Sequence, residues 1–310
     1  MRVLFWGTPE FAASPLRALI GEGFDVVGVV TQPDKPVGRS RSTLVPPPVK
    51  EIALAESIPV LQPEKPRGAE FIEQLRALAP DISVVVAYGH ILTQEVIDLP
   101  KLGTINIHAS LLPKLRGAAP IQAAIREGHD ETGVTIMRMV KALDAGPSIL
   151  QARTLIPDDE TYGELQLRLA ETGALALIEA LALIALGQAT ETPQDDSLAT
   201  FASKIDRDAT KVDWTKDAAT VARAIRALDP RPGALTHAES GDVKLFGGRV
   251  VTGPEGGVPG EVISIAGEGM VVSCGTGAVQ IAHVHPAGKK RIAAHEWQRG
   301  RGIKVGERLF

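Results

Sequence analysis

The first third of the chain alternates short apolar runs with a stretch of helical periodicity. Residues 3–7 and 26–30 are apolar and contain β-branched side chains, which is typical of buried strands. Residues 9–23 lie between them, repeat apolar positions along one side and end in glycines, which predicts a helix. A strand, a helix and a second strand within about 30 residues make a βαβ unit. The pattern therefore predicts a parallel sheet at the start of the chain.

Two more apolar runs, residues 82–87 and 104–107, predict further buried strands of the same sheet. Residues 162–186 are rich in Leu and Ala and are closed by Gly187, which predicts a long helix. We therefore expect an α/β fold over residues 1–187, in the form of a Rossmann-like domain with a mainly parallel sheet.

The pattern changes after residue 187. Residues 188–211 are polar and contain Pro193, which predicts a linker. Residues 212–310 begin with one helical stretch, 218–228, and continue with short apolar runs separated by glycines. Such a pattern is typical of small barrels, so we expect a smaller C-terminal domain that folds as an OB-like β-barrel. The predicted strands are residues 243–246, 261–265, 270–273 and 279–283.

Composition places the chain among ordinary globular proteins, with 44% hydrophobic and 23% charged residues over 310 positions. Its one cysteine, Cys274, excludes an internal disulfide and a thiolate zinc site. The first apolar run is too short for a signal peptide, and no run reaches the ~20 apolar residues of a membrane span. We therefore expect a cytoplasmic protein with no metal and no membrane partner.

The net charge of −4 is unevenly distributed. Residues 1–200 hold 17 Lys and Arg against 25 Asp and Glu, which gives −8. Residues 201–310 hold 16 against 12, which gives +4. A basic C-terminal part indicates a polyanionic partner, although an ordinary solvated surface explains the same balance.

Residues 31–50 predict a long loop, because Pro, Gly, Ser and basic residues dominate them and three consecutive prolines, 46–48, are not expected in a helix. Long loops in compact domains are usually functional or disordered. A merely solvated surface loop is the alternative. The basic side chains of this segment face one acidic residue, Asp34; they are Lys35, Arg39, Arg41 and Lys50.

Neither the three-glycine dinucleotide fingerprint nor the phosphate-binding loop is present in the sequence. Candidate chemistry lies instead at the end of the predicted strand 104–107, where open α/β sheets bind their ligands. Asn106 and His108 are two residues apart, so their side chains lie on the same face. An amide can donate to an oxyanion and an imidazole can carry a proton, which suits chemistry at a carbonyl carbon. A histidine that only caps the strand end is the alternative.

Asp144 is a candidate for orienting His108. It lies in a Leu-Asp-Ala-Gly-Pro turn after the apolar run 134–139. A carboxylate beside an imidazole fixes its tautomer and favours its charged form. An aspartate that only caps the turn is the alternative.

The run from Asn106 to Pro120 reads Asn-Ile-His-x-Ser-Leu-Leu-Pro-x-x-Arg-Gly-x-x-Pro and is followed later by Leu-Asp-x-Gly. In this pattern the chain resembles the formyltransferases that use 10-formyltetrahydrofolate. The resemblance extends to Gly-Thr-Pro-Glu-Phe-Ala at residues 7–12, to Thr-Gln-Pro-Asp at 31–34, and to Val-Val-Ala-Tyr-Gly at 85–89. Pro-Ala-Gly-Lys-Lys at residues 286–290 is similar to the members that act on initiator methionyl-tRNA.

The resemblance implies that the formyl group of 10-formyltetrahydrofolate is transferred to the α-amino group of methionine on initiator tRNA. It implies a catalytic trio of Asn106, His108 and Asp144, a monomer, and no metal. It also implies that the loop at 31–50 enters the acceptor end of the tRNA and that the C-terminal domain binds tRNA. The folate-lining residues would be Ser110, Leu111, Leu112 and Pro113, and the tRNA-binding residues Arg39, Arg41, Lys289 and Lys290.

Two alternatives stay open at this point. Formyltransferases that act on an amine of a sugar nucleotide or of a ribonucleotide share the Asn-x-His run and the later aspartate, and the basic C-terminal domain argues against them. A nucleic-acid-binding scaffold without activity is the other, and the intact Asn106, His108 and Asp144 argue against it.

Overall fold

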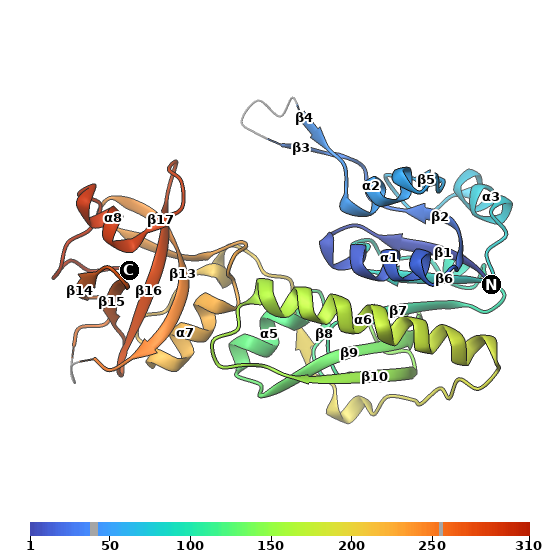
Figure 1. The fold of residues 1–310 in the computed structure, drawn as a ribbon. Coiled ribbons are helices and arrows are strands. Elements are labelled where there is room, and N and C mark those ends of the chain that lie inside the picture. Colours follow the sequence, from blue (N-terminus) through green and yellow to red (C-terminus); the bar gives the residue numbers. More distant parts are fainter. Residues whose placement is uncertain (38–42, 254–256) are drawn as a thin grey trace. The chain divides into compact units, whose positions relative to one another are not determined.

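A seven-stranded sheet organises the first part of the computed structural model, which describes residues 1–37, 43–253 and 257–310 (Figure 1). The strand order is β10-β9-β7-β6-β1-β2-β5. The pairs from β5 to β7 are parallel and β7 pairs antiparallel with β9, so the predicted mainly parallel sheet is confirmed. Its strands are β1 (Arg2–Gly7), β2 (Asp25–Val30), β5 (Val60–Leu61), β6 (Ile82–Val86), β7 (Thr104–His108), β9 (Glu131–Arg138) and β10 (Ser148–Leu155).

Helices cover this sheet and bury its apolar strands. Trp6 of β1 stacks edge-on against Phe71 and Tyr88, with ring centroids 6.0 and 5.3 Å away, in a core that α3 and α4 complete. A side chain on Gly173 of α6 would touch Ile107 of β7, so this helix lies directly on the strand that carries Asn106 and His108. The helices are α1 (Ala13–Gly21), α2 (Pro48–Ala55), α3 (Ala69–Ala77), α4 (Gln94–Ile97) and α6 (Tyr162–Ala185).

The predicted loop at residues 31–50 contains regular structure. β3 (Lys35–Val37) and β4 (Thr43–Val45) form an antiparallel hairpin, and α2 begins at Pro48. The expectation that the three prolines exclude a helix was wrong for the last of them. Proline is well suited to a first helical position, because the amide hydrogen it lacks would have no partner in the helix.

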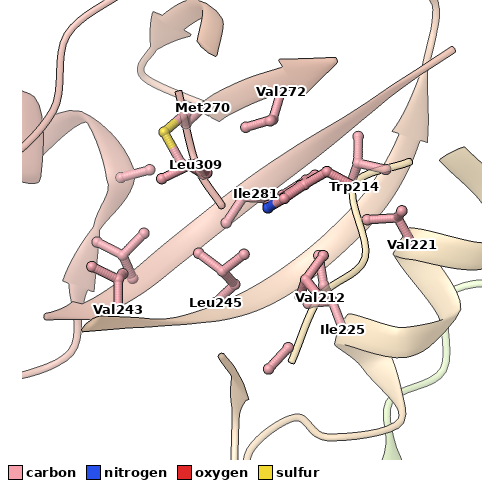
Figure 2. Packing of buried hydrophobic residues seen from close by; sticks show 14 of the residues in the cluster. Val212, Trp214, Val221, Ile225, Val243, Leu245, Met270, Val272, Ile281 and Leu309 are labelled. Carbon is pink, nitrogen blue, oxygen red and sulfur yellow. The ribbon is translucent and has the colours of Figure 1, made fainter. Parts of the chain in front are cut away.

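A second sheet organises the C-terminal part, with strand order β12-β13-β16-β15-β14 and β17 paired to β16. It packs against α7 (Ala218–Arg226) around Trp214 and Trp297, which are 4% and 2% exposed. Figure 2 shows side chains from α7, from β13 and from residues 212–214 entering one core. The other elements are β12 (Ala234–Ala238), β13 (Gly241–Val251), β14 (Val262–Ala266), β15 (Gly269–Ser273), β16 (Ala278–Pro286), β17 (Ile292–Ala293) and α8 (Ala294–Arg299).

The named strands of this second sheet form an open path, so the described residues show no closed barrel. Residues 306–310 nevertheless hydrogen-bond to both of its ends. Phe310 exchanges two backbone hydrogen bonds of 2.8 and 2.9 Å with His237 of β12. The amide of Val262 in β14 donates to the carbonyl oxygen of Glu307 at 2.9 Å.

The chain divides into two compact units that are discontinuous in sequence. The first comprises residues 1–117, 132–154 and 166–201, and the second comprises residues 118–131, 155–165 and 202–310. The second unit also holds α5 (Pro120–Glu127) and the 3₁₀ turn η3 (Asp208–Thr210). Among the helices of the described residues, none has the length and apolarity needed to cross a membrane.

Candidate active site

The carboxyl edge of the main sheet gathers the candidate residues. β7 lies between β6 and β9, with Asn106 opposite Val85 on one side and Met137 on the other. Asn106 is half-buried, and its side-chain amide makes no hydrogen bond to the described residues of the chain. Its amide is therefore available to a bound molecule, as an oxyanion donor must be.

His108 is buried and engages both ring nitrogens. Nε2 lies 2.9 Å from the carbonyl oxygen of Leu115. Because a carbonyl only accepts, Nε2 carries a hydrogen there. Nδ1 faces Oδ2 of Asp144 at 3.7 Å, which is longer than a hydrogen bond. A proton on Nδ1 would make His108 a cation opposite a carboxylate, and catalytic contacts of this kind often shorten only when substrate binds.

Asp144 reaches His108 from the loop between β9 and β10. Its Oδ2 accepts a 2.8 Å hydrogen bond from the amide of Gly117, and its side chain is 15% exposed. The residue has a φ of +47°, in the left-handed region that Asp and Asn tolerate better than most residues. A side chain on Gly146 would overlap the carbonyl oxygen of Arg138. Leu-Asp-x-Gly therefore combines a left-handed aspartate with a position where only glycine fits.

The segment expected to line the folate site, residues 110–113, is held by Thr135 of β9. The Thr135 hydroxyl donates to the carbonyl oxygen of Ser110 at 2.7 Å and accepts from the amide of Leu112 at 3.1 Å. Gln151 donates to the carbonyl oxygen of Leu112 at 2.7 Å. Ser110 and Leu112 are buried, whereas Leu111 and Pro113 are only half-buried. The two half-buried side chains can therefore contact a ligand.

The base of the β3–β4 hairpin carries a second polar cluster, which the sequence analysis did not assign. Lys50 lies 2.8 Å from both carboxylate oxygens of Asp34. Gln62 donates to the same carboxylate at 2.8 Å and to the carbonyl oxygen of Gln32 at 2.9 Å. The hydrogen bond from Gln62, followed by that from Lys50, lowers the pKa of Asp34 below its ordinary value. The expected tRNA contacts Arg39 and Arg41 lie outside the described residues.

The basic loop near the C-terminus contains side chains of two kinds. Lys289 and Lys290 are exposed and have no ion-pair partner among residues 1–37, 43–253 and 257–310. Arg291 lies 4.1 Å above the ring of Phe246 and 3.3 Å from buried Asp229, so it is held in place.

Within the same described ranges no group of three or more His, Cys, Asp or Glu side chains could hold a metal ion. Burial raises the pKa of the Cys274 thiol to about 11, so this thiol is no nucleophile at neutral pH.

Sequence reasoning missed the residues that hold this site, because they lie far from it along the chain. Thr135, Gln194 and Thr200 each hydrogen-bond to the loops that carry the candidate residues. One signal in the sequence could have pointed to them. Arg116 directly precedes the uncharged stretch 117–121, and a buried arginine needs acceptors from elsewhere.

Comparison with known proteins gives matches over the whole chain. Residues 1–181 match the family model "Formyl transferase" and residues 204–302 match "Formyl transferase, C-terminal domain". The methionyl-tRNA formyltransferase of Magnetococcus marinus is 47% identical over 99% of this chain and 98% of its own. The methionyl-tRNA formyltransferase of Moorella thermoacetica is 45% identical over 100% of this chain and 99% of its own.

Solved structures show a similar fold at low sequence identity. HypX from Aquifex aeolicus, in complex with tetrahydrofolic acid, has a TM-score of 0.67 at 21% identity and covers 100% of this chain, which spans 51% of HypX. The sugar 3N-formyl transferase WlaRD, in the presence of dTDP and 5-N-formyl-THF, has a TM-score of 0.68 at 18% identity. The match covers 94% of this chain and 99% of WlaRD. At such identities the likeness concerns the fold alone.

Proposed function

Because the chain belongs to the methionyl-tRNA formyltransferase family, we propose that it transfers the formyl group of 10-formyltetrahydrofolate to the α-amino group of methionine on initiator methionyl-tRNA. The product is N-formylmethionyl-tRNA for translation initiation. The observation that carries the proposal is 45–47% identity over 99–100% of the chain. Amino-sugar formyltransferases resemble this chain far less, as the 18% identity of WlaRD illustrates.

The reaction requires a neutral amine, a stabilised oxyanion and one proton transfer. The amine nitrogen bonds to the formyl carbon, which gives a tetrahedral intermediate with a negative oxygen. The bond from that carbon to N10 of the folate then breaks, N10 gains a proton and the former amine loses one. A free α-amino group has a pKa of ~8, and the adjacent ester lowers this pKa, so a usable fraction of the amine is neutral at pH 7.

Three side chains take the catalytic roles in this proposal. Asn106 donates its unpaired amide to the oxyanion. His108 stabilises the same oxygen or passes a proton once bound substrate replaces the carbonyl of Leu115 at Nε2. Asp144, whose Oδ2 lies 3.7 Å from His108 Nδ1, orients the imidazole. Ser110, Leu111, Leu112 and Pro113 line the folate site, with Leu111 and Pro113 offering exposed surface.

The tRNA is bound by two basic regions in this proposal. Arg39 and Arg41, which follow β3 in the sequence, contact the acceptor end, and Lys289 and Lys290 contact the phosphate backbone. Residues 1–187 form the catalytic domain, residues 188–211 connect it, and residues 212–310 bind tRNA. The C-terminal domain is OB-like in this proposal, which the hydrogen bonds of residues 306–310 to both ends of its open sheet support. The enzyme acts as a monomer in the cytoplasm.

Transfer of labelled formyl from 10-formyltetrahydrofolate tests the function directly. The acceptors are methionyl-initiator tRNA, methionyl-elongator tRNA and a nucleotide-linked amino sugar, with a reaction lacking any acceptor as control. We expect transfer to the initiator only. Transfer to the amino sugar alone would overturn the proposed acceptor and keep the formyl-transfer site.

A further inference from the structure

The loop that carries Asp144 is held through its backbone by a side chain from far along the chain. Gln194 Nε2 donates to the carbonyl oxygen of Asp144 at 2.8 Å and to that of Gly146 at 2.7 Å. A left-handed residue such as Asp144 persists only when its surroundings determine its conformation. Because one amide group binds the carbonyls on both sides of Ala145, it holds the turn in the form that directs Asp144 toward His108.

Gln194 is itself held by a buried arginine. Arg116, whose side chain is 6% exposed, donates to Gln194 Oε1 through Nε at 3.1 Å and through Nη2 at 2.8 Å. With its oxygen bound twice, the amide of Gln194 cannot flip, and its nitrogen must face the two carbonyls. The same guanidinium pairs at 2.7 Å with Asp196, whose side chain is 80% exposed.

The residues on either side of Arg116 hold the two catalytic candidates. The carbonyl oxygen of Leu115 binds His108 Nε2 at 2.9 Å, and the amide of Gly117 binds Asp144 Oδ2 at 2.8 Å. Thr200 supports this stretch, because its hydroxyl accepts from the Leu115 amide at 2.9 Å and its carbonyl accepts from the Arg116 amide at 2.8 Å. His108, Asp144 and residues 194–200 are therefore joined by one network of hydrogen bonds.

We propose that Gln194, oriented by Arg116, is a positioning residue that holds Asp144 opposite His108 for formyl transfer. The proposal rests on the proposed catalytic role of Asp144. It assigns a function in catalysis to a segment that was expected only to connect two domains. A displacement of about 1 Å at a reacting group can cost ~10²-fold in rate, so the loss of one such contact is measurable.

Gln194→Met removes both the amide donor and the acceptor for Arg116. Gln194→Glu keeps the acceptor for Arg116 and places an oxygen against the two carbonyls instead of a donor. We expect both variants to lower kcat about 10- to 100-fold, with KM for folate and for methionyl-tRNA within about threefold of the parent enzyme. Gln188→Met is the matched control, because Gln188 is exposed in the same segment and makes no side-chain hydrogen bond to the described residues.

A double-mutant cycle with Asp144→Asn separates a positioning role from a structural one. If Gln194 acts through Asp144, adding Gln194→Met to Asp144→Asn changes kcat less than about twofold. An unchanged kcat in either single Gln194 variant, or a full additional loss in the double variant, would overturn the positioning role. A slow Asp144→Asn enzyme beside a fast Gln194→Met enzyme overturns this inference alone, whereas a fast Asp144→Asn enzyme overturns the catalytic assignment as well. Thermal unfolding of each variant verifies that it is folded.

Discussion

Both ring nitrogens of His108 are engaged within the protein, one by the carbonyl of Leu115 and the other facing the carboxylate of Asp144. Asn106 differs, because its amide has no partner within the described part of the chain. It is also the only asparagine in the sequence. At the scale of single residues, the candidate site therefore combines two side chains that contact the protein with one whose amide is available to a ligand.

Replacement of Asn106 tests the oxyanion role. Removing one oxyanion donor typically costs ~10²–10³ in rate, so we expect kcat for Asn106→Ala to fall by about that factor. Because the amide makes no hydrogen bond to the described residues, the melting temperature should stay within a few degrees of the parent value. Steady-state kinetics and thermal unfolding measure the two quantities. A large fall in melting temperature without loss of kcat would contradict the assignment.

Gly146 shows how one residue determines the shape of the loop that carries Asp144. A methyl group there would overlap the carbonyl oxygen of Arg138, so we expect Gly146→Ala to lose about 1–3 kcal/mol of unfolding free energy together with activity. Gly21→Ala is the control, since nothing lies within 4 Å of a side chain at that position in α1. Urea unfolding compares the two variants. Equal stability of both would show that the loop accommodates the methyl group.

At the scale of elements, the β3–β4 hairpin is anchored at its base, between β2 of the main sheet and α2. Asp34 precedes the hairpin, Lys50 follows it in α2, and Gln62 follows β5. The side-chain Nε2 of Gln32 donates to the carbonyl oxygen of Tyr88 at 3.0 Å, which joins the anchor to the end of β6. The direction of the hairpin is therefore tied to the edge of the sheet that holds the candidate active site.

Removal of the Lys50 charge tests whether this anchor serves tRNA binding. We expect Lys50→Met to raise KM for methionyl-tRNA about three- to tenfold while KM for folate stays unchanged, because a loosened hairpin loses more conformational entropy on binding. Lys101→Met is the control, since Lys101 forms a similar pair of 2.9 Å with Asp81 and is 74% exposed. An equal effect of both substitutions would contradict the role of the anchor.

The same pair gives a dependence on pH with a definite sign. The pKa of Asp34 is lowered by its hydrogen bonds to Gln62 and Lys50, so its carboxylate stays charged at every pH above its ordinary pKa. The anchor is therefore complete at neutral pH and is lost only as the pH falls through the lowered pKa.

At the scale of the whole molecule, charge is divided between an acidic part with net −8 over residues 1–200 and a basic part with net +4 over residues 201–310. Lys289 and Lys290 are exposed on the basic part, without ion-pair partners in the described ranges, and are therefore suited to phosphate contacts. Each phosphate contact adds about one unit to the slope of log affinity against log salt.

The double variant Lys289→Ala with Lys290→Ala tests these contacts. We expect weaker tRNA binding at low salt and a salt slope smaller by up to about 2, with unchanged folate binding. Lys211→Ala with Lys216→Ala removes the same charge from lysines that lie beside Asp208 and Asp213, and should leave the slope nearly unchanged. An unaltered slope in the first variant would remove these two lysines from the proposed interface.

Local patterns determined much of this fold. The apolar runs at 3–7, 26–30, 82–87 and 104–107 correspond to β1, β2, β6 and β7, because burial on both faces of a parallel sheet leaves a continuous apolar signal. The period of two in β7 also brought Asn106 and His108 to one strand end. The short strands β3, β4 and β12 were not predicted, since three to five residues among turn-forming neighbours carry little periodicity.

The sequence by itself determined which residues are the candidates for the chemistry, because Asn106, His108 and the Leu-Asp-x-Gly turn lie in short patterns whose residue types have few other uses together. Only the tertiary structure decided how they are held. The contacts of Arg116 with Gln194 and of Gln194 with Asp144 join positions 78 and 50 residues apart, and no local period records them. A buried polar group finds its partners on distant loops. Packing of the whole sheet determines which of these loops lie next to each other, so the partners follow from the whole fold.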